Sequence, residues 1–183
     1  MKNLNKFGLI LFLAVSSILS SCSSDDGDGG GGFSGPSTGT FVKAKVGSTN
    51  VLAQGEFANG GYNSGNLVLQ GFDMSGKSVN IQLYALDGAL EVGTYDMGLT
   101  NTEDNYVGSF TLIDVDTSSL TTKTYSSAFC SDSNGTLEIT FIDATKIEGT
   151  FSYKGKELLE NEDCSGATKN VTNGSFRFVI SGS

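Results

Sequence analysis

The stretch "GTLEITFIDATKIEGTFSY", Gly135 to Tyr153, has the clearest structural pattern in this chain. Apolar and polar residues alternate in both of its halves, and a period of two is typical of a strand with one buried face. The connection Asp143-Ala144-Thr145 predicts a turn between the two strands. We therefore predict an antiparallel hairpin with Leu137, Ile139, Phe141, Ile147, Phe151 and Tyr153 facing the core. The outward positions, which we expect to face solvent, include Glu138, Lys146, Glu148 and Thr150.

Alternation of the same kind continues along most of the chain from about Thr38 onward, and no segment has the pattern of a long amphipathic helix. The composition, with 25 Gly, one Pro and 12 Phe, also favours strands joined by tight turns. The other predicted strands are "TFVKAKV", "VLAQGEF", "NLVLQGF", "SVNIQLYA", "GTYDM", "VGSFTLIDV", "TTKTYSS" and "SFRFVIS". The pairs that predict turns are Asn59-Gly60, Ser75-Gly76, Asp87-Gly88, Asn134-Gly135 and Asn173-Gly174.

The number of predicted strands determines the expected fold class. So many half-apolar strands cannot lie in one open sheet without exposing their apolar face. We therefore predict a single all-β domain over residues 38–183, folded as an antiparallel β-sandwich of about eight to ten strands. A closed or flattened up-and-down barrel, like that of lipocalins, is the alternative, because both architectures need one inward face per strand.

The start of the chain predicts an export signal over residues 1–21. Lys2 and Lys6 precede an apolar stretch from Phe7 to Leu19, which is shorter than the roughly 20 residues that a membrane-spanning helix needs. The sequence Leu19-Ser20-Ser21-Cys22 then resembles the lipobox of bacterial lipoproteins. This resemblance implies cleavage before Cys22 and attachment of lipid to its thiol, which would anchor the protein to a membrane.

Residues 22–37 are expected to form a flexible tether behind this anchor. Acidic residues, serine and glycine predominate up to Gly32 and cannot bury enough apolar surface to fold. The acidic run Asp25-Asp26-Gly27-Asp28 also resembles the signal that sends Bacteroidetes lipoproteins to the outer face of the outer membrane. We therefore expect a bacterial outer-membrane protein that faces the cell exterior.

Two cysteines, Cys130 and Cys164, remain after Cys22 is assigned to lipid. Both lie in polar, loop-like stretches on either side of the predicted hairpin. Exported proteins mature in oxidising surroundings, so we predict a structural disulfide between them.

A family resemblance rests on three stretches: "FVKAKVGS", "IEGTFSY" and "VTNGSFRFVI". Together they are similar to small, uncharacterised cell-surface lipoproteins of Bacteroidetes and flavobacteria, which are grouped as a domain of unknown function. The resemblance extends from Phe41 to Ile180. It implies a shared fold and a location in the cell envelope, and it supplies no catalytic residue.

The residue content excludes several kinds of chemistry. The chain has no histidine, which excludes Ser-His and Cys-His nucleophiles and His-ligated zinc. No phosphate-binding loop or dinucleotide fingerprint is present, so no cofactor is expected. Carboxylates are the remaining candidates: a glycoside hydrolase pair among Asp114, Asp116, Glu138 and Glu148 is the less favoured hypothesis. Asp114 and Asp116 are also weak candidates for calcium ligands.

The remaining functional hypothesis is binding without catalysis. A net charge of −9 makes nucleic acid an unexpected partner. Tyrosine rings stack on sugars or peptides while their hydroxyl groups stay in water, so exposed tyrosines are candidates for a binding platform. We expect a non-enzymatic β domain that binds an extracellular ligand, glycan or protein, with a structural subunit of an envelope complex as the alternative. The candidate tyrosines are Tyr62, Tyr84, Tyr95, Tyr106 and Tyr125.

Replacing the lipidation residue tests the predicted anchor. We expect Cys22→Ala to move the protein from the detergent phase to the aqueous phase, because acyl chains contribute about 0.8 kcal/mol per buried methylene. Detergent-phase partitioning of cell extracts measures this change. Ser23→Ala is the matched control and should stay with the membrane. Membrane retention of Cys22→Ala would contradict the assignment.

Overall fold

The computed structural model describes residues 32–99, 105–161 and 163–180. The predicted signal peptide, Cys22 and the tether up to residue 31 lie outside these residues. The first six elements are β1 (Phe41–Val46), β2 (Thr49–Gln54), the short 3-10 helix η1 (Gly55–Phe57), β3 (Ala58–Asn63), β4 (Asn66–Phe72) and β5 (Lys77–Ala85). The others are β6 (Gly93–Asp96), β7 (Tyr106–Asp116), β8 (Thr121–Ser126), β9 (Asn134–Ile142), β10 (Lys146–Glu157) and β11 (Thr168–Val179).

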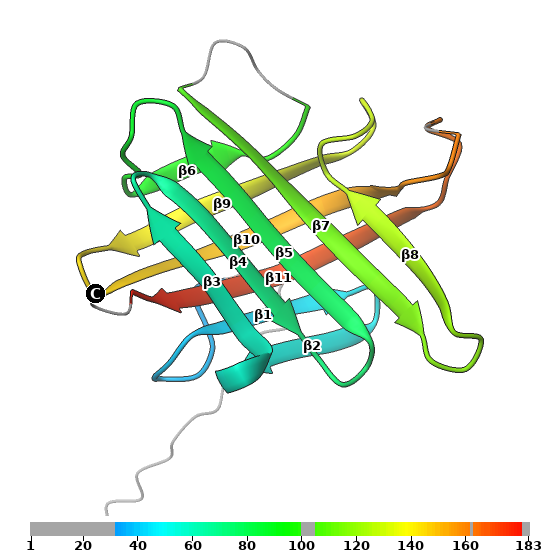
Figure 1. Ribbon diagram of the computed structural model, residues 1–183, viewed down its shortest axis with the longest axis horizontal. Coiled ribbons are helices and arrows are strands. Elements are labelled where there is room, and N and C mark those ends of the chain that lie inside the picture. Colours follow the sequence, from blue (N-terminus) through cyan, green and yellow to red (C-terminus); the bar gives the residue numbers. More distant parts are fainter. Residues whose placement is uncertain (1–31, 100–104, 162, 181–183) are drawn as a thin grey trace, which may run out of the picture.

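The strands form one antiparallel sheet that folds over itself into two layers. Its order is β2-β1-β11-β10-β8-β7-β5-β4-β3, with β9 paired to β10 and β6 paired to β9. Strands β3, β4, β5, β7 and β8 form one layer, which runs obliquely across the other six strands (Figure 1). The predicted all-β, antiparallel fold is confirmed. The described residues contain eleven strands, above the expected eight to ten, and the two layers belong to one sheet.

Strand β10 joins the two layers. Its first part pairs with β9, as the predicted hairpin requires, and its last two residues pair with β8 in the other layer. The hairpin turn is held by Asp143, whose carboxylate accepts hydrogen bonds from the backbone N–H groups of Thr145 at 2.7 Å and Lys146 at 2.9 Å. On the opposite side of the molecule, η1 carries the chain from β2 to β3 and thus from one layer to the other.

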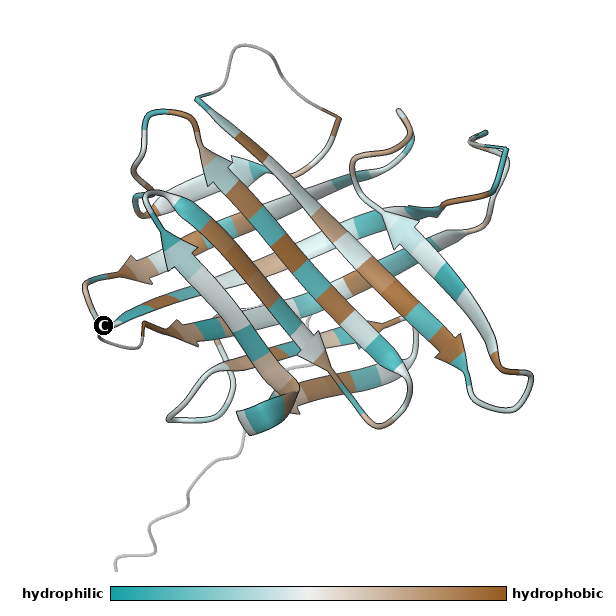
Figure 2. Ribbon diagram, viewed as in Figure 1, coloured by the Kyte–Doolittle hydropathy of each residue, from teal (hydrophilic) through white to brown (hydrophobic). Residues whose placement is uncertain are grey.

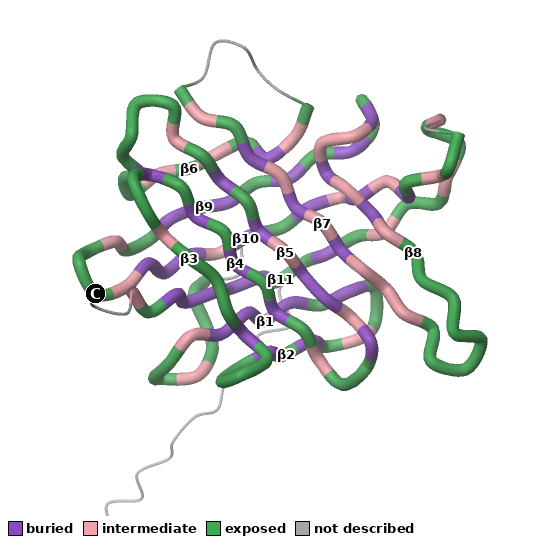
Figure 3. The backbone as a smooth tube through the Cα atoms, viewed as in Figure 1, coloured by how far each residue is buried: buried purple, intermediate pink, exposed green. Residues whose placement is uncertain are grey.

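The alternating pattern places the apolar residues between the layers. Hydrophobic and hydrophilic residues alternate along β4, β5 and β7 in Figure 2, and buried and exposed residues alternate in the same way in Figure 3. The ring of Phe110 lies 4.7 Å from that of Tyr153 and 5.4 Å from that of Phe151, measured between centroids. Side chains from both layers therefore fill the interior. The confirmed inward positions include Val42, Ala44, Val46, Val79, Ile81, Leu83, Leu137, Ile139 and Ile147.

Three of the predicted glycine turns are wrong. Asn59-Gly60, Asn134-Gly135 and Asn173-Gly174 lie within strands, while Ser75-Gly76 and Asp87-Gly88 do form turns. The reason is close packing: a Cβ atom at Gly135 would lie 2.7 Å from the ring of Phe110, and one at Gly174 would lie 2.5 Å from the ring of Phe151. These two glycines therefore leave room for core rings. For this reason the Asn-Gly pairs at these two positions do not mark turns.

Phe141 is a second correction. The register between β9 and β10 shifts at this point, so that Glu148 pairs with Phe141 while the next residue, Gly149, pairs with Ile139. The extra residue of this β-bulge turns Phe141 to the outer surface, where 38% of it is exposed. The ammonium group of Lys146 lies 4.6 Å from its ring centroid.

The segment from Phe33 to Thr40, called here the N-terminal segment, packs on the outer face of β1 and β11. The Pro36 carbonyl accepts a hydrogen bond from Arg177 at 2.7 Å, and the Ser34 carbonyl accepts one from the hydroxyl of Ser175. Thr40 accepts the backbone N–H of Val179 at 3.0 Å. The packed domain therefore includes residues 33–37, which the sequence assigned to the flexible tether.

Arg177 and Glu148 form a buried ion pair beneath this segment, which corrects the expectation that Glu148 faces solvent. Arg177 Nε donates to Glu148 Oε1 at 2.5 Å, and Lys146 Nζ lies 3.0 Å from the same oxygen. The guanidinium also lies over the rings of Phe33 and Phe41, at 5.4 and 5.5 Å from their centroids. Glu148 is buried against Arg177, whose guanidinium in turn contacts Pro36 and Phe33 of the N-terminal segment.

The ion pair sets the ionisation of Glu148. Burial alone would raise its pKa, but the hydrogen bonds and charges of Arg177 and Lys146 outweigh burial and hold the pKa below its ordinary value of 4.5. A carboxylate with a lowered pKa stabilises the folded state above its unfolded pKa. This contribution is lost as the pH falls through the folded pKa.

The predicted disulfide is confirmed. Cys130 and Cys164 are bonded, with their Cα atoms 5.9 Å apart and 34 residues of separation along the chain. The bond ties the segment after β8 to the connection between β10 and β11. Closing a loop of this length stabilises a fold by roughly 3–4 kcal/mol in the chain-entropy model.

Breaking the ion pair tests its contribution to stability. We expect Arg177→Met to reduce the free energy of unfolding by about 3 kcal/mol at pH 7, because Glu148 then loses its main buried partner. Adding Glu148→Leu should recover most of this loss. Urea denaturation measures both effects.

The pH dependence provides the control for this experiment. The difference between wild type and Arg177→Met should shrink as the pH falls through the lowered pKa of Glu148, because protonation removes the charge that Arg177 neutralises. Lys154→Met, on the same outer face, should change stability by no more than about 0.5 kcal/mol. A deficit of Arg177→Met that stays constant down to pH 2 would contradict the assignment.

Candidate binding face

The outer surface of the layer β3-β4-β5-β7-β8 carries no charged side chain at its outward positions, among the residues that the structure describes. We call this surface the uncharged face. The charged residues of these strands lie at the alternate, core-side positions near the strand ends. The amide side chains of the uncharged face are Asn59, Asn63, Asn66, Gln70, Asn80 and Gln82. Its hydroxyl side chains are Ser78, Tyr84, Ser109, Thr111, Thr122, Thr124 and Ser126.

The outer surface of the other layer differs in charge. Its outward positions include the Arg177–Glu148 pair and the nearby Lys43, Lys45 and Glu138. The N-terminal segment covers part of this surface. Because the chain as a whole has a net charge of −9, an uncharged layer surface is a distinctive feature of this molecule.

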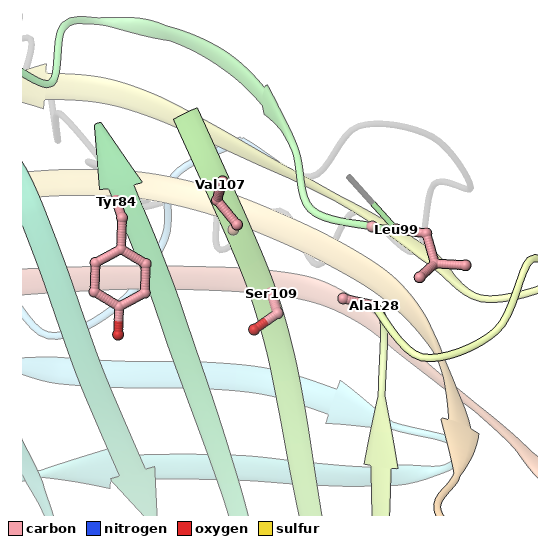
Figure 4. A pocket seen from close by; sticks show the side chains of 7 residues that line it. Tyr84, Leu99, Val107, Ser109 and Ala128 are labelled. Carbon is pink, nitrogen blue, oxygen red and sulfur yellow. The ribbon is translucent and has the colours of Figure 1, made fainter. Parts of the chain in front are cut away.

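An open groove lies at one end of the uncharged face, with a volume of about 220 Å³. Val107 and Ser109 of β7 lie between Tyr84 on one side and Leu99 and Ala128 on the other (Figure 4). Typical pockets for drug-sized ligands have volumes of about 300–1,000 Å³, so this groove accommodates a smaller group, such as one ring of a longer ligand. Gly98 and Gly108 complete its lining.

Strand register brings the polar and aromatic groups of the groove together. Tyr84 lies directly opposite Val107, and Gln82 lies directly opposite Ser109. Residues opposite each other in an antiparallel pair have Cβ atoms about 4.5–5.5 Å apart. Among the described residues, the Gln82 amide, the Tyr84 hydroxyl and the Ser109 hydroxyl have no side-chain hydrogen-bond partner. These three groups are therefore free to bind a ligand.

Neighbouring amides are held in place by the sheet. Gln70 donates to the hydroxyl of Ser78 at 3.1 Å, and Asn80 donates to the backbone carbonyl of Thr111 at 3.4 Å. Both contacts link adjacent strands across the uncharged face. The face thus combines fixed amides with free polar groups.

Only Tyr84 of the five candidate tyrosines stands on this face. Tyr125 is 3% exposed and belongs to the core, against which Tyr62 also packs. The rings of Tyr95 and Tyr106 pack edge to face at 4.9 Å, and the Tyr106 hydroxyl accepts the Asp96 backbone N–H at 2.9 Å. The predicted tyrosine platform is therefore wrong for four residues, because their rings pack inside the fold or against each other.

The calcium candidates have other partners. Asp114 lies 2.9 Å from the ammonium of Lys77 and 3.2 Å from that of Lys169. Asp116 accepts hydrogen bonds from the hydroxyl and backbone N–H of Ser118, which lower its pKa to about 2. No cluster of three or more Cys, Asp or Glu residues within the described ranges is arranged to hold a metal ion. The geometry thus gives the calcium hypothesis no support.

The carboxylates of the glycoside hydrolase hypothesis lie on different sides of the sheet. Glu138 and Glu148 are on the outer face of β9 and β10, where Glu138 accepts a hydrogen bond from Thr150 at 3.4 Å. Asp114 and Asp116 lie on core-side positions at the end of β7. Within each pair that shares a side, one carboxylate is held by two cations: Glu148 by Arg177 and Lys146, and Asp114 by Lys77 and Lys169. The geometry thus gives the hydrolase hypothesis no support.

No protein-family model matches this chain, and neither curated proteins nor solved structures show significant similarity to it. Within the residues that the structure describes, no helix has the length and apolar character needed to span a membrane. The uncharged face therefore has to be interpreted from its own chemistry.

A sequence signal for this face exists but is incomplete. The predicted strand "SVNIQLYA" has Ser78, Asn80, Gln82 and Tyr84 at alternate positions, and none of them is charged. The sequence does not indicate that β4 and β7 lie on either side of this strand with uncharged outward residues of their own. Only the strand order brings these residues together into one face.

Stability measurements separate the groove from the core. We expect Tyr84→Ala and Gln82→Ala to change the free energy of unfolding by no more than about 0.5 kcal/mol, because both side chains are exposed and lack partners. Tyr125→Ala, in the core, should cost about 3 kcal/mol or more. Urea denaturation of the three variants provides the comparison. A large loss of stability in Tyr84→Ala would assign this ring a structural role.

Proposed function

We propose that this protein is a bacterial outer-membrane lipoprotein, anchored through lipid on Cys22, whose β domain binds a ligand at the cell exterior without catalysis. The uncharged face is the proposed binding surface. The signal-like start of the chain, its lipobox and the acidic run after Cys22 support the anchor and the location. The resemblance to Bacteroidetes cell-surface lipoproteins supports the same setting.

The observation that carries the binding proposal is the free groove at Tyr84. An exposed aromatic ring lies beside unpaired amide and hydroxyl groups on an antiparallel sheet. Binding sites commonly combine apolar contact with a few directed polar groups in this way. The absence of histidine and the ion pairs that hold Asp114 and Glu148 support a role without catalysis.

The path of the N-terminal segment supports the proposed orientation. This segment enters the domain across the outer face of β1 and β11, through the contacts of Ser34 and Pro36. The uncharged face belongs to the other layer. A lipid anchor that precedes residue 33 would therefore join the domain on the β1-β11 side and leave the uncharged face accessible.

A structural role in an envelope complex is the second candidate, and one apolar patch favours it. The rings of Phe57 and Phe72 lie 6.4 Å apart at the η1 end of the uncharged face, and both are about 40% exposed. Met74, in the following turn, is 83% exposed. Exposed apolar patches of this kind mark protein contacts. Under this alternative, the patch and not the groove would be the contact surface.

Cysteine labelling on intact cells tests the proposed presentation. We expect Gln82→Cys, on the uncharged face, and Thr136→Cys, on the outer face of β9, to react with a membrane-impermeant maleimide. The native Cys130 and Cys164 are bonded to each other and should not react. Labelling that requires permeabilised cells would contradict an exterior location.

Photo-crosslinking from the same two positions tests which surface binds. A benzophenone attached at Gln82→Cys should form adducts of higher mass on intact cells, while the matched probe at Thr136→Cys should not. A third probe at Met74→Cys reports on the apolar patch. Adducts formed only from Met74→Cys would favour the assembly role and overturn the groove as the binding surface.

A further inference from the structure

We infer that the ligand of the uncharged face is a neutral polysaccharide, one sugar ring of which stacks on Tyr84 in the groove. This inference rests on the proposed binding function and adds its ligand class. Three properties of the face support it: its lack of charge, its balance of hydrogen-bond donors and acceptors, and the exposed aromatic ring.

The absence of charge selects a neutral ligand. An anionic polymer would find no cation at the described outward positions of this layer, and the net charge of −9 would repel it. A cationic peptide would find no carboxylate there. Electrostatic complementarity thus favours a ligand that is itself uncharged.

The polar groups of the face match sugar hydroxyls. A hydroxyl group donates one hydrogen bond and accepts others, and the Gln82 amide and the Ser109 hydroxyl likewise offer both functions. These two side chains lie opposite each other across β5 and β7 and have no partner among the described residues. Asn66 extends the same surface on β4, where it pairs in register with Tyr84. The surface can therefore exchange hydrogen bonds with several hydroxyls of one chain.

Tyr84 supplies the apolar contact. Its ring is 37% exposed and borders the groove, with Val107 opposite it and Leu99 beyond. The ring can cover the C–H face of a sugar while its hydroxyl stays in water. The groove has room for about one ring, and the outward residues of β4, β5 and β7 continue the uncharged surface beyond it. This geometry suits a polymer more than an isolated small molecule.

A protein ligand fits the same face less well. Protein interfaces commonly have a desolvated apolar centre with a polar rim. Here the centre of the face is mainly polar, with Asn80, Gln82 and Thr111 next to an exposed Val68, and the exposed phenylalanines lie at its edge. Burying these amides would require matched partners from a protein, whereas a sugar chain presents hydroxyls along its whole length.

Binding measurements with the full-length lipoprotein test this inference. The protein, in a detergent without a sugar headgroup, is titrated with dextran, mannan and β-1,3-glucan, and with alginate and heparin as anionic controls. We expect at least one neutral polysaccharide to bind and both anionic ones to bind at least tenfold more weakly. Isothermal titration calorimetry provides the dissociation constants.

Variants locate the binding site. Tyr84→Ala and Gln82→Ala should each weaken binding about tenfold, since exposed aromatic and polar anchors at binding sites contribute on this scale. Tyr84→Phe keeps the ring and should stay within about threefold of wild type. Thr136→Ala, on the other layer, is the matched control and should bind like wild type.

The outcomes separate this inference from the proposed function. Failure of all three neutral polysaccharides, equal binding of alginate, or unchanged binding by Tyr84→Ala would each overturn the neutral polysaccharide as the ligand. Proteinase-sensitive adducts at Gln82→Cys in the crosslinking experiment would identify a protein ligand and also overturn it. In either case, labelling of Gln82→Cys on intact cells would still support the proposed exposure of this face at the cell surface.

Discussion

The structure depends on the pairing of β10 with strands of both layers. This strand pairs with β9 along most of its length and with β8 at its end, so a single sheet bends over itself around one element. The bend brings Phe151 and Tyr153 of β10 against Phe110 of β7, and the three rings stack in the interior. Backbone hydrogen bonding and hydrophobic burial thus act on the same strand.

Folding over in this way gives the domain two outer surfaces with different chemistry. One carries a buried ion pair, Arg177 with Glu148, beneath the N-terminal segment. The other has amide, hydroxyl and a few apolar side chains, and its groove at Tyr84 is open. In our proposal the first surface lies toward the anchor and the second meets the ligand. The charge difference between the layers supports this division of roles, because only one of the two outer surfaces lacks charged side chains at its described outward positions.

Individual residues show which features of the structure the sequence pattern predicts. Leu137 and Ile139 face the core as predicted, because alternation along a strand follows directly from backbone geometry. Phe141 does not, because a bulge shifts its register. Glu148 follows the predicted outward side but is buried there, since Arg177, which the N-terminal segment holds, lies against it. The alternating pattern predicts which side of a strand each residue faces. It does not predict which other residues cover that side.

The sequence by itself determined the all-β class, the hairpin around Asp143 and the pairing of Cys130 with Cys164, since these depend on local periodicity, turn chemistry and cysteine content. Only the tertiary structure decided which strands are neighbours and therefore which outward residues share a surface. Gln82 and Ser109 are separated along the chain by β6 and its connections, and strand pairing alone places them opposite each other. A binding face made from several strands is a product of that long-range pairing, which local sequence patterns do not encode.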